Sequence, residues 1–151
     1  MKKRAKPFKP TPKKHHPKSL TLVHEDHDVI VIAKPSGLLT MSNDRVSDKT
    51  AYAFLNDYVR KGVAKSRNRV FIVHRLDRET SGLLVFAKHE EAKRYLQLEW
   101  ANFEKTYYAV VHGTLAQKQG TLTSYLAENG VHKMFSVNDA NRGKLSKTEY
   151  Q

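Results

Sequence analysis

The sequence contains no cysteine among its 151 residues. Disulfide bonds, thiolate zinc sites and cysteine nucleophiles are therefore excluded, and the composition fits a reducing compartment, so we expect a cytoplasmic location. No apolar run approaches the roughly 20 residues of a membrane-spanning helix. The basic opening, residues 1–4, is not followed by the apolar stretch of a secretory signal. We expect one globular domain without a membrane partner.

Acidic residues are missing from residues 1–18, which carry eight lysines and arginines and four of the five prolines. Proline disfavours helix, so the segment is predicted to be an extended, disordered arm. Two interpretations remain open. The arm could bind RNA phosphates without sequence preference, or it could be a solubilising tail.

Beyond the arm, apolar periodicity predicts more strands than helices. Helices are expected from a cap at Asp48 through residue 60, and over residues 89–103, with Trp100 and Phe103 in the core. Strands are expected at residues 20–25, 29–33, 70–73, 83–87, 107–112, 122–126, 132–137 and 147–151. Strands adjacent in sequence could pair antiparallel, which predicts an α+β domain with a mixed or mostly antiparallel sheet and flanking helices.

The most distinctive segment is His-Arg-Leu-Asp-Arg-Glu-Thr-Ser-Gly at residues 74–82. It places Asp77 between an arginine and a tight turn, with an apolar strand on each side. A rigid sheet can hold such a loop and present one carboxylate at its tip. One alternative is an ordinary surface turn in which Arg75 and Asp77 are simply solvated. For Arg75, another is a structural salt bridge to Asp77 or Glu79.

Residues 74–84, His-Arg-Leu-Asp-x-x-Thr-Ser-Gly-Leu-Leu, resemble the catalytic signature of the RluA-type pseudouridine synthases, which isomerise uridine to pseudouridine in structured RNA. Lys-Pro-Ser-Gly at residues 34–37 and Lys-Thr-Tyr-Tyr-Ala at residues 105–109 resemble two further family segments in the same order. The related RsuA-type enzymes usually begin the signature with glycine, so His74 favours the RluA type.

The resemblance implies that residues 19–151 form the N-terminal two-thirds of the catalytic domain. The family's later motif, Gly-Arg-x-His-Gln-Ile-Arg, supplies a basic partner for the catalytic aspartate, and nothing in this sequence matches it. We therefore expect a fragment of a longer gene product, whose own activity is open.

The resemblance also assigns roles to individual residues. Asp77 is the catalytic aspartate, which attacks the nucleotide covalently or removes a proton to give a glycal; Tyr107 stacks on the target base. RNA contacts are expected from Arg75, Lys34 and Lys105, and loop-shaping roles from His74, Thr80, Ser81 and Gly82. No cofactor is implied, because uracil is both leaving group and acceptor. We expect a monomer that acts on ribosomal or transfer RNA.

Two other interpretations stay open: an RNA-binding module that keeps the fold without the activity, and a general basic nucleic-acid-binding protein in which the Asp77 loop is incidental. Histidine pairs at residues 15–16 and at His24 and His27 could suggest a metal. No cysteines or suitably spaced carboxylates accompany them, so no metal is expected.

Overall fold

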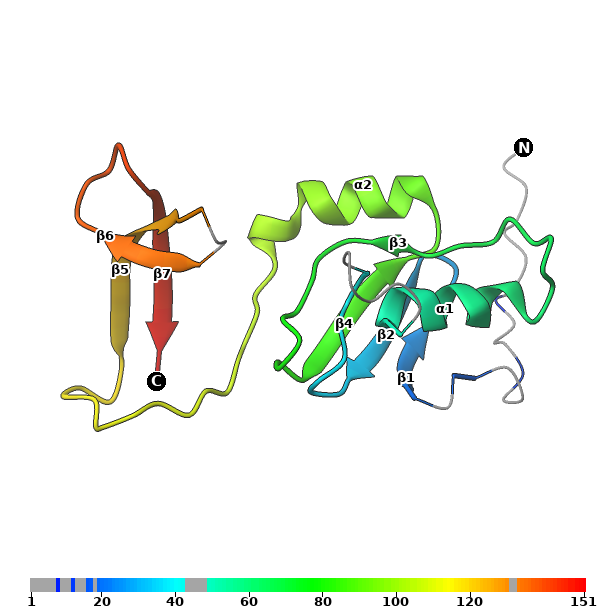
Figure 1. Cartoon of the computed structure of the whole chain (residues 1–151), viewed down its shortest axis with the longest axis horizontal. Helices are drawn as coiled ribbons and strands as arrows, with labels where there is room; N and C mark the ends of the chain where they lie inside the picture. Colours follow the sequence, from blue (N-terminus) through cyan, green and yellow to red (C-terminus); the bar gives the residue numbers. More distant parts are fainter. Residues whose placement is uncertain (1–7, 9–11, 13–15, 18, 43–48, 131–132) are drawn as a thin grey trace. The chain divides into compact units, whose positions relative to one another are not determined.

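The computed structural model describes the chain except for residues 1–7, 9–11, 13–15, 18, 43–48 and 131–132 (Figure 1). The chain divides into two compact units, Met1–Lys105 and Thr106–Gln151, and each is considered by itself. Most of the predicted arm, together with the predicted cap at Asp48, lies outside the described residues.

The first unit is built on an antiparallel sheet with strand order β1-β2-β4-β3. Its strands are β1 (Thr21–Glu25), β2 (Val29–Lys34), β3 (Phe71–Ile72) and β4 (Gly82–Ala87). In β2 every second residue is buried, ending with Lys34, as expected for a strand with one face on the core. The pairing of β2 with β4 runs from Val29 opposite Ala87 to Lys34 opposite Gly82. The predicted hairpin at residues 20–33 is confirmed.

Helix α1 (Ala51–Arg60) covers one face of this sheet (Figure 1). Its N-terminal cap is Thr50, whose hydroxyl accepts a hydrogen bond from the Ala53 N–H at 3.1 Å. The apolar side chains at Ala51, Leu55 and Tyr58 recur at helical spacing and pack into the core. Their partners from the sheet and its loops include Ile30, Ile32, Val70, Leu76, Leu84 and Phe86.

Helix α2 (Glu90–Leu98) packs on the opposite face. Adjacent residues of β4 point to opposite faces of the sheet. Phe86 therefore faces α1, whereas Ala87 packs with Val73 and Ala92 in a second apolar cluster, and Trp100 packs against that cluster. The prediction of one helix through residue 103 was wrong. The α-helix ends at Leu98, and a 3₁₀ turn follows at Trp100–Asn102. There the Asn102 side chain hydrogen-bonds the Glu99 carboxylate at 2.8 Å, a local contact that competes with continued α-helix.

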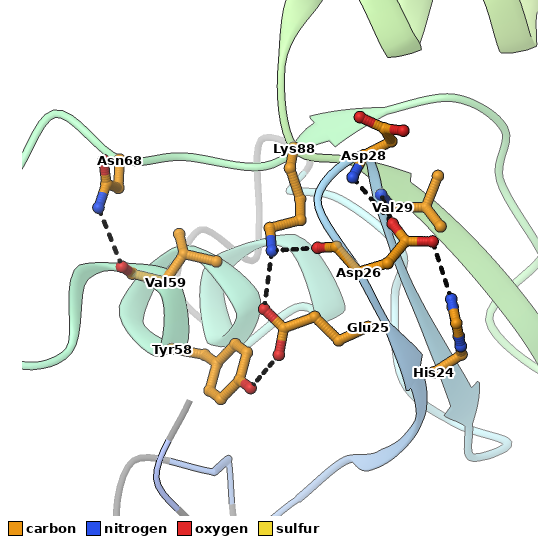
Figure 2. A network of polar contacts seen from close by, with 9 residues as sticks. All are labelled: His24, Glu25, Asp26, Asp28, Val29, Tyr58, Val59, Asn68 and Lys88. Atoms are coloured by element: carbon orange, nitrogen blue, oxygen red, sulfur yellow. Dashed lines mark hydrogen bonds and ion pairs between the residues drawn. The ribbon is translucent and has the colours of Figure 1, made fainter. Parts of the chain in front are cut away.

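A polar network fixes the end of the first sheet that carries the β1–β2 turn (Figure 2). The Lys88 ammonium donates to Glu25 Oε1 at 3.0 Å and to the Asp26 carbonyl. The Tyr58 hydroxyl donates to the other Glu25 oxygen, so α1, β1 and the residue after β4 share one partly buried carboxylate. Burial alone would raise the pKa of Asp26, but hydrogen bonds from His24 and from two backbone N–H groups lower it to about 2.

The second unit holds a three-stranded antiparallel sheet, with β5 (Gly120–Glu128) between β6 (Met134–Val137) and β7 (Lys144–Tyr150). The strand predicted at residues 107–112 is absent: these residues are exposed and have no regular structure. The run of aromatic and β-branched residues suits a strand, but a strand forms only where a partner completes its hydrogen bonds. Antiparallel pairing with two helices confirms the predicted α+β class. None of the helices in the described residues is long and apolar enough to span a bilayer.

Candidate active site

Residues 73–81 connect β3 to β4 without regular structure and form what we call the Asp77 loop. Leu76 is only 8% exposed and belongs to the main core, whereas Arg75 and Asp77 on either side of it are exposed. Neither Arg75 nor Asp77 forms an ion pair in the part of the chain that the structure describes. The buried leucine anchors the loop, and the guanidinium and the carboxylate remain available to a ligand.

A second segment, residues 34–40, lies against this loop, and we call it the cradle. The Gly37 N–H donates to the Arg78 carbonyl at 2.8 Å, and Arg78 Nε donates back to the Gly37 carbonyl at 3.1 Å. The Ser36 hydroxyl donates to the Glu79 carbonyl at 2.7 Å. Gly37 has a φ of 84°, which side-chain-bearing residues rarely adopt. The glycine of the Lys-Pro-x-Gly segment thus allows the turn that meets the Asp77 loop.

Lys34 is the first residue of the cradle and is only 1% exposed. Its ammonium donates to the carbonyls of Leu38 at 2.7 Å and of Pro35 and Arg78 at 3.1 Å each. Burial lowers the pKa of Lys34, opposed by the negative charges of Glu79 and Asp77. The prediction that Lys34 contacts RNA was wrong, because its ammonium is buried and bonded to the backbone of the cradle and of the loop.

Thr40 forms another link between the cradle and the loop, one that no motif in the sequence singles out. It is 3% exposed. Its hydroxyl donates to the Leu76 carbonyl at 2.8 Å and accepts from the Leu76 N–H at 3.2 Å. A hydroxyl among the apolar neighbours of residues 38–41 was the only signal that could have identified it.

His74 ties the beginning of the loop to β4. Its Nε2 accepts a hydrogen bond from the Val85 N–H at 3.1 Å, so that nitrogen carries no proton. The imidazole stacks on the Trp100 ring with centroids 4.3 Å apart. Burial, and secondarily the charge of Lys105, lowers the pKa of His74. A neutral, stacked imidazole fits the loop-shaping role predicted for it.

Lys105 contacts the same tryptophan that stacks on His74. Its ammonium donates to the Trp100 carbonyl at 2.9 Å and lies 5.5 Å from the centre of the Trp100 ring. The side chain is exposed. Its RNA contact stays a prediction.

The turn residues after Asp77 contribute mainly through the backbone. The Thr80 N–H donates to the Asp77 carbonyl at 3.2 Å, which closes a tight turn. Gly82 begins β4 with a φ of 135°, a conformation that favours glycine. Ser81 is exposed beside it. The structure therefore gives a direct physical reason for Gly82.

Tyr107 belongs to the second unit and is 62% exposed. Its stacking role stays a prediction. Among the described residues, no three histidine, aspartate or glutamate side chains gather as they would around a metal ion.

The sequence of this chain is similar to those of known proteins. The family model described as RNA pseudouridylate synthase matches residues 28–151. Ribosomal large subunit pseudouridine synthase D of Borreliella burgdorferi is 33% identical over 138 residues, which are 87% of this chain and 42% of that protein. tRNA pseudouridine synthase C of Haemophilus ducreyi is 36% identical over 103 residues, which are 66% of this chain and 40% of that protein. The chain thus spans less than half the length of these relatives.

Among solved structures, human RNA pseudouridylate synthase domain containing 4 matches with a TM-score of 0.62 and 19% identity, over 87% of this chain and 52% of that one. This likeness concerns the fold and agrees with the α+β class. Together with the family model, the curated relatives confirm the resemblance first seen in residues 74–84. The chain belongs to the RNA pseudouridylate synthase family, and within it to the RluA type.

Proposed function

We propose that this chain provides the Asp77-bearing part of an enzyme that converts uridine to pseudouridine in structured RNA. The observation that carries the proposal is the exposed Asp77 carboxylate on a loop whose backbone is fixed from beneath by the cradle. Catalytic groups must be held within about half an ångström of their working position. The hydrogen bonds from Lys34 and Thr40 of the cradle to the backbone of the loop support such positioning and leave the carboxylate exposed.

The reaction breaks the bond between ribose C1′ and uracil N1 and joins C1′ to uracil C5. C5 loses a proton and N1 gains one, so substrate and product are isomers and no oxidant or cofactor is required. These atoms are inaccessible within a stacked helix, and the target nucleotide must leave the stack. We propose that Asp77 attacks the nucleotide, or takes the proton from C2′, once the base has been extruded.

Other residues complete the proposed site. Arg75 is exposed two residues before Asp77 and is proposed to enter the space that the base vacates. Tyr107 is proposed to stack on the extruded uracil, an interaction worth about 1–3 kcal/mol. Lys105 is proposed to meet the RNA backbone. The net charge of +12 supports RNA as the partner.

The relatives' names include a ribosomal large subunit synthase and a tRNA synthase. Ribosomal or transfer RNA is therefore the proposed substrate class. We further propose that the protein acts as a monomer in the cytoplasm, where such RNA is found.

The test is release of tritium from RNA labelled at uracil C5, since pseudouridine formation must remove that hydrogen. It should be run with this chain, with the longest reading frame that contains it, and with Asp77→Asn in each. Unmodified total RNA supplies every candidate target. We expect release by the longer protein and its loss in Asp77→Asn.

The result that would overturn the proposal is specific. A folded, RNA-binding longer protein that releases no tritium would indicate a binding module that retains the fold without the chemistry. Release that survives in Asp77→Asn would remove Asp77 from the reaction. Salt-sensitive RNA binding alone decides nothing, because the basic charge already ensures it.

A further inference from the structure

The Thr40 hydroxyl forms a two-sided hydrogen bond with a single residue of the Asp77 loop. It donates to the Leu76 carbonyl at 2.8 Å and accepts from the Leu76 N–H at 3.2 Å. Leu76 stands between Arg75 and Asp77, and its side chain is buried in the core. One hydroxyl therefore holds the main chain immediately before Asp77 and immediately after Arg75.

Thr40 is itself anchored to the helix that packs on the sheet. Its carbonyl accepts the Tyr52 N–H at 3.0 Å, and the neighbouring Leu39 carbonyl accepts the Ala51 N–H at 2.9 Å. Leu39 also forms a bridge with Thr50, the cap of α1. A continuous path of hydrogen bonds thus runs from the first turn of α1 through Thr40 to Leu76.

Only a side chain with both a donor and an acceptor can replace this link. Valine has nearly the shape of threonine but can satisfy neither the N–H nor the carbonyl of Leu76, both of which face a buried partner. The loop would then shift to find other hydrogen bonds. A displacement of about 1 Å in a catalytic group can cost about 100-fold in rate.

We propose that Thr40 is a positioning residue, which sets the orientation of Asp77 and Arg75 through the backbone of Leu76. The inference rests on the proposed function, because it assigns Thr40 a part in the same reaction. Thr40 does not touch the RNA. Its hydroxyl acts through Leu76. Asp77 alone is proposed to carry the reaction, whereas Arg75 is one of several proposed RNA contacts, so loss of the hydroxyl affects the chemical step more than RNA affinity.

The experiment compares Thr40→Val and Thr40→Ser in the longest reading frame that contains the chain. Thr21→Val, an exposed threonine on the edge strand β1, is the matched control. Single-turnover tritium release measures the chemical step, and filter binding of the same RNA measures Kd. Urea unfolding sets the conditions under which each variant is fully folded. Hydrogen exchange of the Leu76 amide reports the hydrogen bond directly.

We expect Thr40→Val to lower the single-turnover rate about 10- to 100-fold, with Kd changed less than about threefold and faster exchange at Leu76. Thr40→Ser keeps the hydroxyl and should stay within about threefold of the wild type. A general structural defect would affect rate and Kd together and would not be rescued by serine.

Four results would overturn all or part of the inference. A folded Thr40→Val that keeps the wild-type rate within about twofold would show that the hydroxyl is not needed. Equal losses in Thr40→Val and Thr40→Ser would show that side-chain shape matters and the hydroxyl does not. Absence of release from the wild type would instead refute the proposed function and the catalytic part of this inference with it. Unchanged Leu76 exchange in Thr40→Val would refute the hydrogen bond alone.

Discussion

Replacing Lys34 with methionine tests whether a buried cation holds the Asp77 loop in place. Methionine has nearly the length and volume of lysine but no ammonium. The change removes three hydrogen bonds to main-chain carbonyls, of Pro35, Leu38 and Arg78. The Arg78 carbonyl keeps a second donor, the Gly37 N–H, so the loss falls mainly on the other two.

The magnitude follows from opposing terms. Hydrogen bonds from a charged donor contribute about 1.5–3 kcal/mol each, so three give roughly 5–9 kcal/mol. Removing the ammonium also removes the several kcal/mol that its burial costs. The difference predicts that Lys34→Met destabilises the first unit by about 2–3 kcal/mol. With a urea dependence of about 1–3 kcal/mol per molar, the midpoint should fall by about 0.7–3 M.

Urea unfolding followed by tryptophan fluorescence measures this change, because Trp100 is the only tryptophan and stacks on His74 at the site. Lys65→Met is the matched control: Lys65 is exposed in the loop after α1, and its replacement should leave the midpoint within about 0.3 M. A Lys34→Met midpoint equal to that of Lys65→Met would refute the reasoning. It would mean that the cradle is held by its remaining contacts alone.

Three further changes test other parts of the molecule. Burial holds the pKa of His74 below its ordinary 6.5, so the unfolded chain takes up the proton first and the stability of the wild type falls as the pH drops below 6.5. In urea titrations from about pH 7.5 to 5, His74→Gln should lose less stability than the wild type, and an equal loss in both would contradict this. Gly82→Ala should lower the free energy of unfolding by about 1–3 kcal/mol, because φ at this position is 135°. Calorimetry of the control Gly130→Ala, at an open position without such a φ, should show little change. Replacing Lys65 and Arg67 with glutamine should reduce the salt dependence of log K for RNA by about one unit for each phosphate that is no longer neutralised, and an unchanged slope would place this basic loop away from RNA.

The sequence identified the parts of the site that depend on local pattern. Two apolar strands around a charged segment predicted a fixed loop with Asp77 at its tip. In the structure, Asp77 lies within the loop between β3 and β4 and is exposed beside the buried Leu76. The apolar run at residues 29–33 likewise predicted a strand, and the structure has β2 there. Strands and the loops between them depend on residues a few positions apart in the sequence, so the local pattern of apolar and polar residues predicts them.

The contacts that fix the loop could not be predicted in this way. Thr40 meets Leu76 across 36 positions, and Lys34 meets Arg78 across 44. No pattern within either segment says which distant carbonyl a buried donor will reach. For the same reason Lys34 was interpreted as an RNA contact: a lysine is usually exposed, and only the packed sheet and cradle show that this one is buried.

The strand predicted at residues 107–112 fails for a related reason. Its residues have high strand propensity, but a strand requires hydrogen-bond partners as well as a suitable composition. Tyr108 and Val110 are fully exposed in the structure. Local composition therefore indicates where a strand can form, and the position of the partner strand decides whether it does.

Burial divides the polar groups of the site into two kinds with different mutant phenotypes. Arg75 and Asp77 are exposed and make no ion pair among the described residues. Asp77→Asn should therefore abolish the reaction while changing stability by no more than about 0.5 kcal/mol. Lys34 and Thr40 are buried and bonded to the backbone, so their replacement should reduce stability as well as rate. If Asp77→Asn destabilised the fold as much as Lys34→Met, the carboxylate would be a structural group, and the separation between the loop and its support would not hold.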